Sequence, residues 1–268
     1  MFSWIENNGV QYLRIEEFCN LGVKAYFTSR LGGVSCGNYS SLNLGLHTQD
    51  NKEDVLENRK KIANATGINS SDFVAAEQVH GNNVYIVGDK DKGAGARNYK
   101  TCIPGVDALI TARKGIPLIS FYADCVPLFF LEPEKNIIAL AHAGWKGTVS
   151  KIALKTINEM QNTFNINCEK LWVGIGPSIS RDNYLVNDVV IDKLKREFPK
   201  WQDFVVYKGS DQYLLDLWQV NISILEEVGV LSKQIILSEY CTYKNNDLFY
   251  SYRKENGRTG RMASIIFI

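Results

Sequence analysis

Residues 118–145 read LISFYADCVPLFFLEPEKNIIALAHAGW and contain three short apolar runs, at 118–122, 126–131 and 137–141. Each run is rich in β-branched and aromatic residues and is shorter than a typical helix, which favours buried β-strands. Further runs of the same kind predict strands at 23–28, 83–87, 108–111, 171–175, 235–237, 249–252 and 264–268.

Helical signals are fewer than strand signals. Residues 51–66 have a polar start and are followed by Gly67, a typical helix stop. A second helix is expected over 148–164, and a third over 216–228, where Asp216 can cap the first turn. Predicted strands outnumber helices by about three to one without strict alternation, which is typical of an α+β fold with mixed sheets.

Nucleotide-binding signatures are missing. The GIGPSI stretch that begins at Gly174 has Ile179 where a dinucleotide-binding fold needs its third glycine, and no P-loop motif occurs. Residues 89–105 (DKDKGAGARNYKTCIPG) predict a surface loop. Since no repeat, linker or charge block divides the chain, we expect residues 1–268 to form a single domain.

The composition is that of an ordinary globular protein, with 45% hydrophobic and 22% charged residues. The net charge of +1 argues against bulk binding to nucleic acid or to an acidic membrane. No apolar stretch approaches the ~20 residues that span a bilayer, and the N-terminal MFSWIENNGV does not resemble a signal peptide. Together with six scattered cysteines, these features predict a cytoplasmic protein with unpaired thiols.

Reactive side chains occur at the ends of predicted strands. Of the three histidines, His80 and His142 each follow a β-like run and precede small residues, whereas His47 lies in a polar turn. Cys125 has the same type of position, beside Asp124. A thiolate with two imidazoles suits Zn²⁺ and leaves a fourth coordination position open.

The spacing of His80, Cys125 and His142 matches no short zinc motif, so two other interpretations stay open. In one, Cys125 is a small buried residue and His142 is a hydrogen-bonded core histidine. In the other, Cys125 is a nucleophile, with His142 as its base and Asp124 nearby. Cys125, His142 and Asp124 are therefore the candidate catalytic residues.

Several cations occur beside glycines, namely Arg30 in TSRLGG, Lys146 in AGWKG, and Arg258 and Arg261 in GRTGR. Glycine lets the backbone approach an anion closely while the cation balances its charge, so these cations are candidates for a phosphate or carboxylate pocket, whereas any single one of them is better explained as part of a solvated turn. The candidate substrate-binding residues are Arg30, Asn43, Lys146 and Arg261, although sequence alone gives Asn43 no specific role.

Taken together, these segments closely resemble the YfiH-like family, also called the laccase-domain, polyphenol oxidase or multifunctional purine nucleoside enzyme family. The resemblance runs from about residue 25 to the C-terminus, and its most specific motifs are ADC-x-P and HAGW. The similar segments are TSRLGGVS (28–35), SLNLGLH (41–47), EQVHG (77–81), DALIT (107–111), YADCVPL (122–128), AHAGWKGT (141–148), VGIGPSI (173–179), CT (241–242), SYR (251–253) and TGR (259–261).

The resemblance implies a layered α/β/β/α fold and a metal site formed by His80, Cys125 and His142, which favours the metal interpretation. It also implies phosphorolysis of adenosine, inosine, guanosine and 5′-methylthioadenosine, deamination of adenosine, and laccase-like oxidation of phenols. Purine nucleosides and inorganic phosphate are then the expected partners, with Zn²⁺ as the cofactor and copper as an alternative. We expect a monomer or a small homo-oligomer.

Two departures from the family pattern affect these expectations. Lys146 stands where the family usually has arginine, which keeps the charge but loses the two-pronged contact. Asn183 replaces a cysteine and Leu185 a glutamate in the stretch GPSISRDNYLV, so the roles of those two family residues are not carried over to this chain.

Alternative functions follow from the same residues. The signature of classical zinc deaminases is missing, so a proton carrier for deamination would be Asp124 or Glu77. Copper can bind an N/S site, but three histidines are too few for the several copper centres of a multicopper oxidase. A metal-free Cys-His hydrolase or amidase acting on a peptidoglycan precursor is a further alternative.

Overall fold

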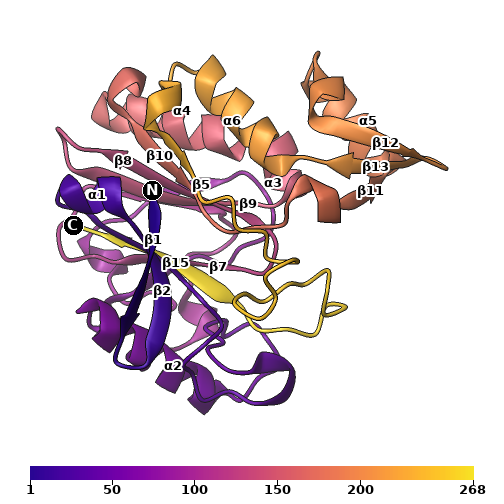
Figure 1. Cartoon of the computed structure of the whole chain (residues 1–268). Helices are drawn as coiled ribbons and strands as arrows, with labels where there is room; N and C mark the ends of the chain where they lie inside the picture. The colour runs from indigo at the N-terminus through magenta and orange to yellow at the C-terminus, as the bar shows by residue number, and fades with distance from the viewer.

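Two six-stranded mixed sheets lie face to face in the computed structural model, which describes residues 1–268 (Figure 1). The first has the order β1 (Phe2–Asn7), β2 (Val10–Ile15), β3 (Lys24–Thr28), β15 (Met262–Phe267), β7 (Leu118–Tyr122), β4 (Val74–Ala75). The second has the order β14 (Ile235–Leu237), β10 (Trp172–Ile175), β8 (Val126–Glu132), β9 (Ile137–Ala143), β6 (Ala108–Thr111), β5 (Val84–Ile86). Neighbouring strands are antiparallel except for the parallel pairs β4–β7, β10–β14 and β5–β6.

The alternating side chains of β8 show how the layers form. Phe129 and Leu131 point into the core between the two sheets, whereas Leu128 and Phe130 belong to the core under the helices. All four are fully buried because successive residues of a strand face opposite sides of the sheet, and both sides are covered here. A strand buried on both faces explains the continuous apolar run in the sequence.

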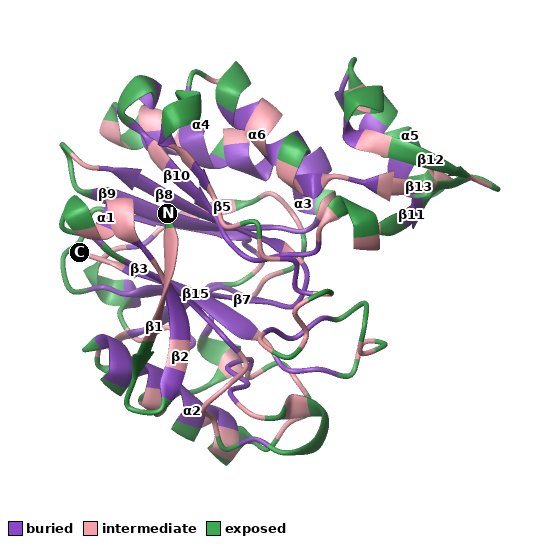
Figure 2. Cartoon of the chain, in the orientation of Figure 1, coloured by how far each residue is buried: buried purple, intermediate pink, exposed green.

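Helices cover the two outer faces. Residues of α2 (Lys52–Thr66) pack against the first sheet, and residues of α4 (Ile152–Phe164) and α6 (Leu217–Glu227) pack against the second. The short helix α1 (Glu16–Asn20) connects β2 to β3. A second short helix, α3 (Trp145–Val149), leads from β9 to α4. Figure 2 shows the buried strands between helices whose outer faces are exposed. The expected α+β fold with an α/β/β/α layering is therefore confirmed.

A small third sheet extends beyond the two main sheets. It has the order β11 (Leu185–Asn187), β13 (Gln212–Leu215), β12 (Val205–Gly209), and it projects from one end of the molecule together with α5 (Asp188–Glu197) (Figure 1). Its apolar side chains join the core under the helices. No helix of the chain is both long and apolar enough to cross a membrane.

Two of the three expected helices are confirmed, with the predicted ends. Asn51 caps α2 through the backbone amides of Glu53 and Asp54, and Gly67 ends the helix in the left-handed conformation. Asp216 caps α6 in the same way. The helix expected over 148–164 is broken, because Lys151 adopts a left-handed conformation between α3 and α4.

Nine of the expected strands correspond to strands of the two main sheets. The strand expected at 249–252 is wrong: Phe249 and Tyr250 are buried, but the segment pairs with no strand and leads into a series of turns. Burial in the core between the sheets accounts for its apolar residues. Residues 89–105 contain no strand, as expected for a loop, but the segment does not lie wholly on the surface, because Asp91, Ala96, Cys102 and Ile103 are buried.

Candidate active site

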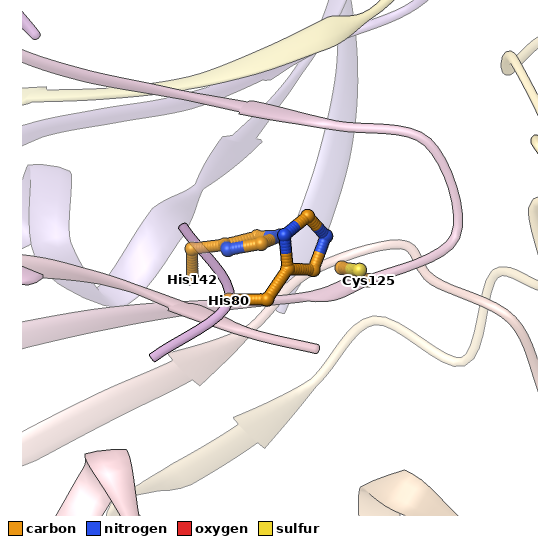
Figure 3. Close-up of side chains that lie close together, drawn as sticks. All are labelled: His80, Cys125 and His142. Atoms are coloured by element: carbon orange, nitrogen blue, oxygen red, sulfur yellow. The ribbon is translucent and has the colours of Figure 1, made fainter. Parts of the chain in front are cut away.

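The fold brings His80, Cys125 and His142 together at one end of the two sheets. His142 lies on β9, Cys125 lies in the turn between β7 and β8, and His80 lies in the loop that leads to β5 (Figure 3). One potential ligand atom from each residue lies within 4.8 Å of the other two. The two imidazole rings are 4.7 Å apart between centroids and nearly perpendicular, at 79°. This arrangement directs one sulfur and two nitrogen donors to a common point.

Asp107, just before β6, holds the two histidines in place. Its Oδ1 lies 2.9 Å from Nδ1 of His142 and accepts the backbone N–H of His80, also at 2.9 Å. Its Oδ2 accepts the backbone N–H groups of Gly81 and Val79. With Nδ1 of His142 directed to Asp107, the Nε2 atom of that ring is left for the cluster.

The backbone around the cluster has unusual local geometry. His80 and Asp124 both have positive φ angles, 60° and 82°, which turn the chain sharply beside each ligand. Gly144 lies so close that a Cβ atom there would be 3.0 Å from Sγ of Cys125 and 3.1 Å from Cδ2 of His80. A larger residue in place of this glycine of the HAGW motif would therefore press on two side chains of the cluster.

Electrostatics favour a thiolate beside an imidazolium in the protein without metal. Burial alone would raise the pKa of Cys125, but the charge of His142 and hydrogen bonds from His142 and His80 hold that pKa well below its usual value. Burial alone would lower the pKa of His142, but Cys125 and Asp107 raise it. A deprotonated sulfur is the form that binds metal, so these three residues fit a Zn²⁺ or copper ion in donor type and number.

The cluster opens into a cavity of about 450 Å³. A space of this size is within the range that small-molecule ligands occupy. Five of its fifteen lining residues are phenylalanine, tyrosine or tryptophan, and two arginines add positive charge. Besides the cluster, the lining residues are His47, Ala76, Gln78, Tyr99, Phe121, Ala123, Asp124, Trp145, Tyr184, Tyr252, Arg253 and Arg261.

The two candidate proton carriers differ in position. Asp124 lies on the cavity wall, where its oxygens accept hydrogen bonds from the Thr242 hydroxyl at 2.6 Å and the Arg253 backbone N–H at 2.7 Å. Burial raises the pKa of Asp124 above its usual value. Glu77 is not part of the wall, and one of its oxygens accepts the backbone N–H of Gly105.

Of the candidate substrate-binding residues, the structure places only Arg261 on the cavity wall. Asn43 is fully buried behind it, and its Oδ1 accepts the backbone N–H of Arg261 at 2.9 Å. Arg30 forms an ion pair with Glu255 at 3.1 Å. Lys146 is exposed and lies outside the wall. Its charge is therefore not directed into the cavity.

Sequence reasoning missed Asp107 and Arg253 as functional candidates. Asp107 is the one charged residue beside the apolar run 108–111, and Arg253 lies in the SYR segment, so both signals were present. It also gave no specific role to the aromatic wall, which includes Tyr184 from the segment that departs from the family pattern. In that segment Asn183 donates to Sγ of Cys241 and is not part of the wall.

Comparison with known proteins places the chain among relatives over nearly its whole length. Residues 24–268 match the family model described as "Multi-copper polyphenol oxidoreductase laccase". The chain belongs to this family. It is 41% identical to "Purine nucleoside phosphorylase YlmD" of Bacillus subtilis, over 92% of this chain and 89% of that protein. It is 38% identical to the protein of the same name from Geobacillus stearothermophilus, over 91% and 90% of the two chains.

Solved structures of the laccase family have the same fold. "Bacillus licheniformis hypothetical protein YfiH" superposes with a TM-score of 0.95 at 35% identity, covering 100% of this chain and 98% of that one. YlmD from Geobacillus stearothermophilus superposes with a TM-score of 0.94 at 37% identity, covering 99% and 98%. The expected resemblance to the YfiH-like family is confirmed.

Proposed function

We propose that this protein is a purine nucleoside phosphorylase and that its reaction takes place in the cavity beside His80, Cys125 and His142. The observation that carries the proposal is the combination of this reactive cluster with an aromatic, positively charged cavity. Aromatic rings bind a purine base by stacking, and arginines attract phosphate. The relatives named purine nucleoside phosphorylase support the same reaction.

In phosphorolysis, an oxygen of inorganic phosphate attacks C1′ of the ribose as the bond from C1′ to the purine nitrogen breaks. The electron pair of that bond leaves with the purine, which takes up a proton, and the products are the free base and ribose 1-phosphate. Asp124 is our candidate for the group that donates this proton, because burial raises its pKa and its side chain lies on the cavity wall.

His80, Cys125 and His142 would hold the metal ion, which we propose to be Zn²⁺, with copper as the alternative. When bound, such an ion supplies a positive charge that polarises an oxygen or nitrogen of the substrate. Asp107 keeps the His142 ring oriented, and Cys125 provides the thiolate.

The substrates that we propose are adenosine, inosine, guanosine and 5′-methylthioadenosine, with deamination of adenosine as a second reaction of the same site. The one His-Cys-His cluster offers a single metal position, and a multicopper oxidase needs several. A cytoplasmic location and a monomeric or small oligomeric state stay predictions.

Chromatography of adenosine incubated with metal-replete protein, with and without phosphate, tests this proposal. Phosphorolysis predicts adenine only when phosphate is present, and deamination predicts inosine in both samples. The His80→Ala variant is the control for contaminating activity. If neither product exceeds the level of that control, the nucleoside function is wrong and a Cys125-His142 hydrolase becomes the better explanation.

A further inference from the structure

The cavity wall carries two guanidinium groups without an acidic partner, from Arg253 and Arg261. No carboxylate oxygen lies within ion-pair distance of either group, whereas Arg30 nearby is paired with Glu255. Asp124 is the only carboxylate on the wall, and both of its oxygens already accept short hydrogen bonds. Neither arginine therefore forms an ion pair within the protein.

Both guanidinium groups are held in place through one nitrogen. Nη1 of Arg253 donates to the carbonyl of Leu185 at 2.8 Å, and its guanidinium carbon lies 5.1 Å from the centre of the Tyr184 ring. Nη1 of Arg261 donates to the carbonyls of Thr259 and Gly260 at 2.8 and 2.9 Å. The Nε and Nη2 groups of both side chains have no acceptor in the protein, so each arginine keeps two donor nitrogens for a ligand.

Hydrogen bonds from the backbone of both arginines fix their positions relative to the cluster. The backbone N–H of Arg253 donates to Asp124, the neighbour of Cys125. The stem of Arg261 passes so close to Gly45 that a Cβ atom there would lie 2.9 Å from its Cγ, and its backbone N–H donates to Asn43. Side chains that are already ordered lose less entropy when they bind an anion.

We infer that Arg253 and Arg261 form an oxyanion subsite in the cavity and, building on the proposed function, that its ligand is inorganic phosphate. A planar guanidinium presents paired N–H donors that match two oxygens of a phosphate, which a lysine cannot do. Phosphate is thereby assigned to two arginines that line the cavity, the exposed Arg253 and the half-buried Arg261. Lys146 does not line the cavity, and Arg30 is paired with Glu255.

Direct binding of inorganic phosphate, measured by calorimetry on the metal-replete protein without nucleoside, tests the subsite. Loss of a charged hydrogen-bond donor predicts that Arg253→Gln and Arg261→Gln each weaken phosphate binding by about tenfold or more. Arg253→Lys and Arg261→Lys should retain part of the affinity, because they keep the charge. Arg113→Gln is the matched control, since that exposed arginine pairs with Asp89 away from the cavity.

Kinetics separate the failure of this inference from the failure of the proposed function. In phosphorolysis, both glutamine variants should raise KM for phosphate by about tenfold and leave KM for the nucleoside within about threefold. Unchanged phosphate binding in folded glutamine and lysine variants would overturn the subsite, even if phosphorolysis is observed. If no phosphorolysis is found, arginine-dependent phosphate binding would still support the subsite.

Adenosine 5′-monophosphate distinguishes free phosphate from the phosphoryl group of a larger ligand. The inference predicts that inorganic phosphate binds in the absence of nucleoside and that saturating adenosine does not displace it. If only the nucleotide binds in an arginine-dependent way, the assignment to inorganic phosphate is wrong.

Discussion

Asp107 links the two histidines of the cluster, because its carboxylate contacts the ring of His142 and accepts backbone N–H groups from the turn that carries His80. Asp107 lies 35 residues before His142 in the chain, and the pairing of β6 with β9 brings the two residues together. A partner of this kind typically changes metal affinity without binding the metal itself.

We predict that Asp107→Asn lowers the affinity for Zn²⁺ by about 10- to 100-fold, because the amide keeps the shape of the side chain but removes its charge and one acceptor. Competition with a chromophoric chelator measures the change. Asp91→Asn is the matched control, since Asp91 is also a buried carboxylate that accepts a backbone N–H, but its partners are Gly88 and Tyr85 and not the residues of the cluster. Wild-type affinity in folded Asp107→Asn would contradict this role.

The residues of the candidate site differ in how well the sequence alone predicts their roles. His80, Cys125 and His142 stand out because each ends or interrupts a β-like run, and the family resemblance then favoured reading the three together as a metal site. Asp107 and Arg253 were missed because their roles depend on partners that only the folded chain brings near, such as the Leu185 carbonyl for Arg253. Burial in the fold likewise separates Asn43 from the cavity that it supports.

At the scale of elements, α2 supports one wall of the cavity through buried polar side chains. Asn58 donates to the carbonyls of Ser41 and Asn43, and Arg59 donates to the carbonyl of Leu44. These contacts hold the segment that leads to His47 on the cavity wall. The stability of the N-terminal turn of this helix therefore affects the cavity indirectly.

We predict that Asn51→Ala lowers the free energy of unfolding by about 1 kcal/mol, since the side chain caps two backbone amides of α2. Urea denaturation measures the loss. Asn51→Asp keeps a capping oxygen and should stay close to the wild type. Equal losses in both variants, or no loss in the alanine variant, would show that the cap does not stabilise the protein.

Elements with a regular pattern were predicted well, and those that depend on distant contacts were not. The runs at 126–131 and 137–141 correspond to β8 and β9 because their burial on both faces gives continuous apolar sequences. The β1–β2 hairpin was missed because both of its strands mix polar with apolar residues, and the outer strand β1 is in addition only half-buried. The strand predicted at 249–252 was wrong because Phe249 and Tyr250 are buried in the core although the segment pairs with no strand.

At the scale of the whole molecule, one core joins the two sheets. Strands from the beginning, middle and end of the chain meet in the first sheet, where β15 lies between β3 and β7. Phe129 of β8 lies in the core between the sheets with residues of β2, β3 and β15. A single domain over residues 1–268 stays our prediction.

We predict a single cooperative unfolding transition, with far-UV and near-UV signals that coincide. Phe129→Ala should lower the free energy of unfolding by about 3–5 kcal/mol and shift both signals together, because it opens a cavity in the shared core. Tyr207→Ala is the control, since that side chain is 59% exposed on β12. Two separate transitions would contradict the single-domain expectation.

The most direct test of the proposed function is the rate of ribose 1-phosphate formation from inosine and phosphate, measured with metal content for the wild type and Cys125→Ala. The wild type should form one ribose 1-phosphate per hypoxanthine released, and Cys125→Ala should lose bound metal and this activity together. Undiminished ribose 1-phosphate formation by Cys125→Ala, or hypoxanthine release by the wild type without ribose 1-phosphate, would contradict a phosphorylase centred on His80, Cys125 and His142.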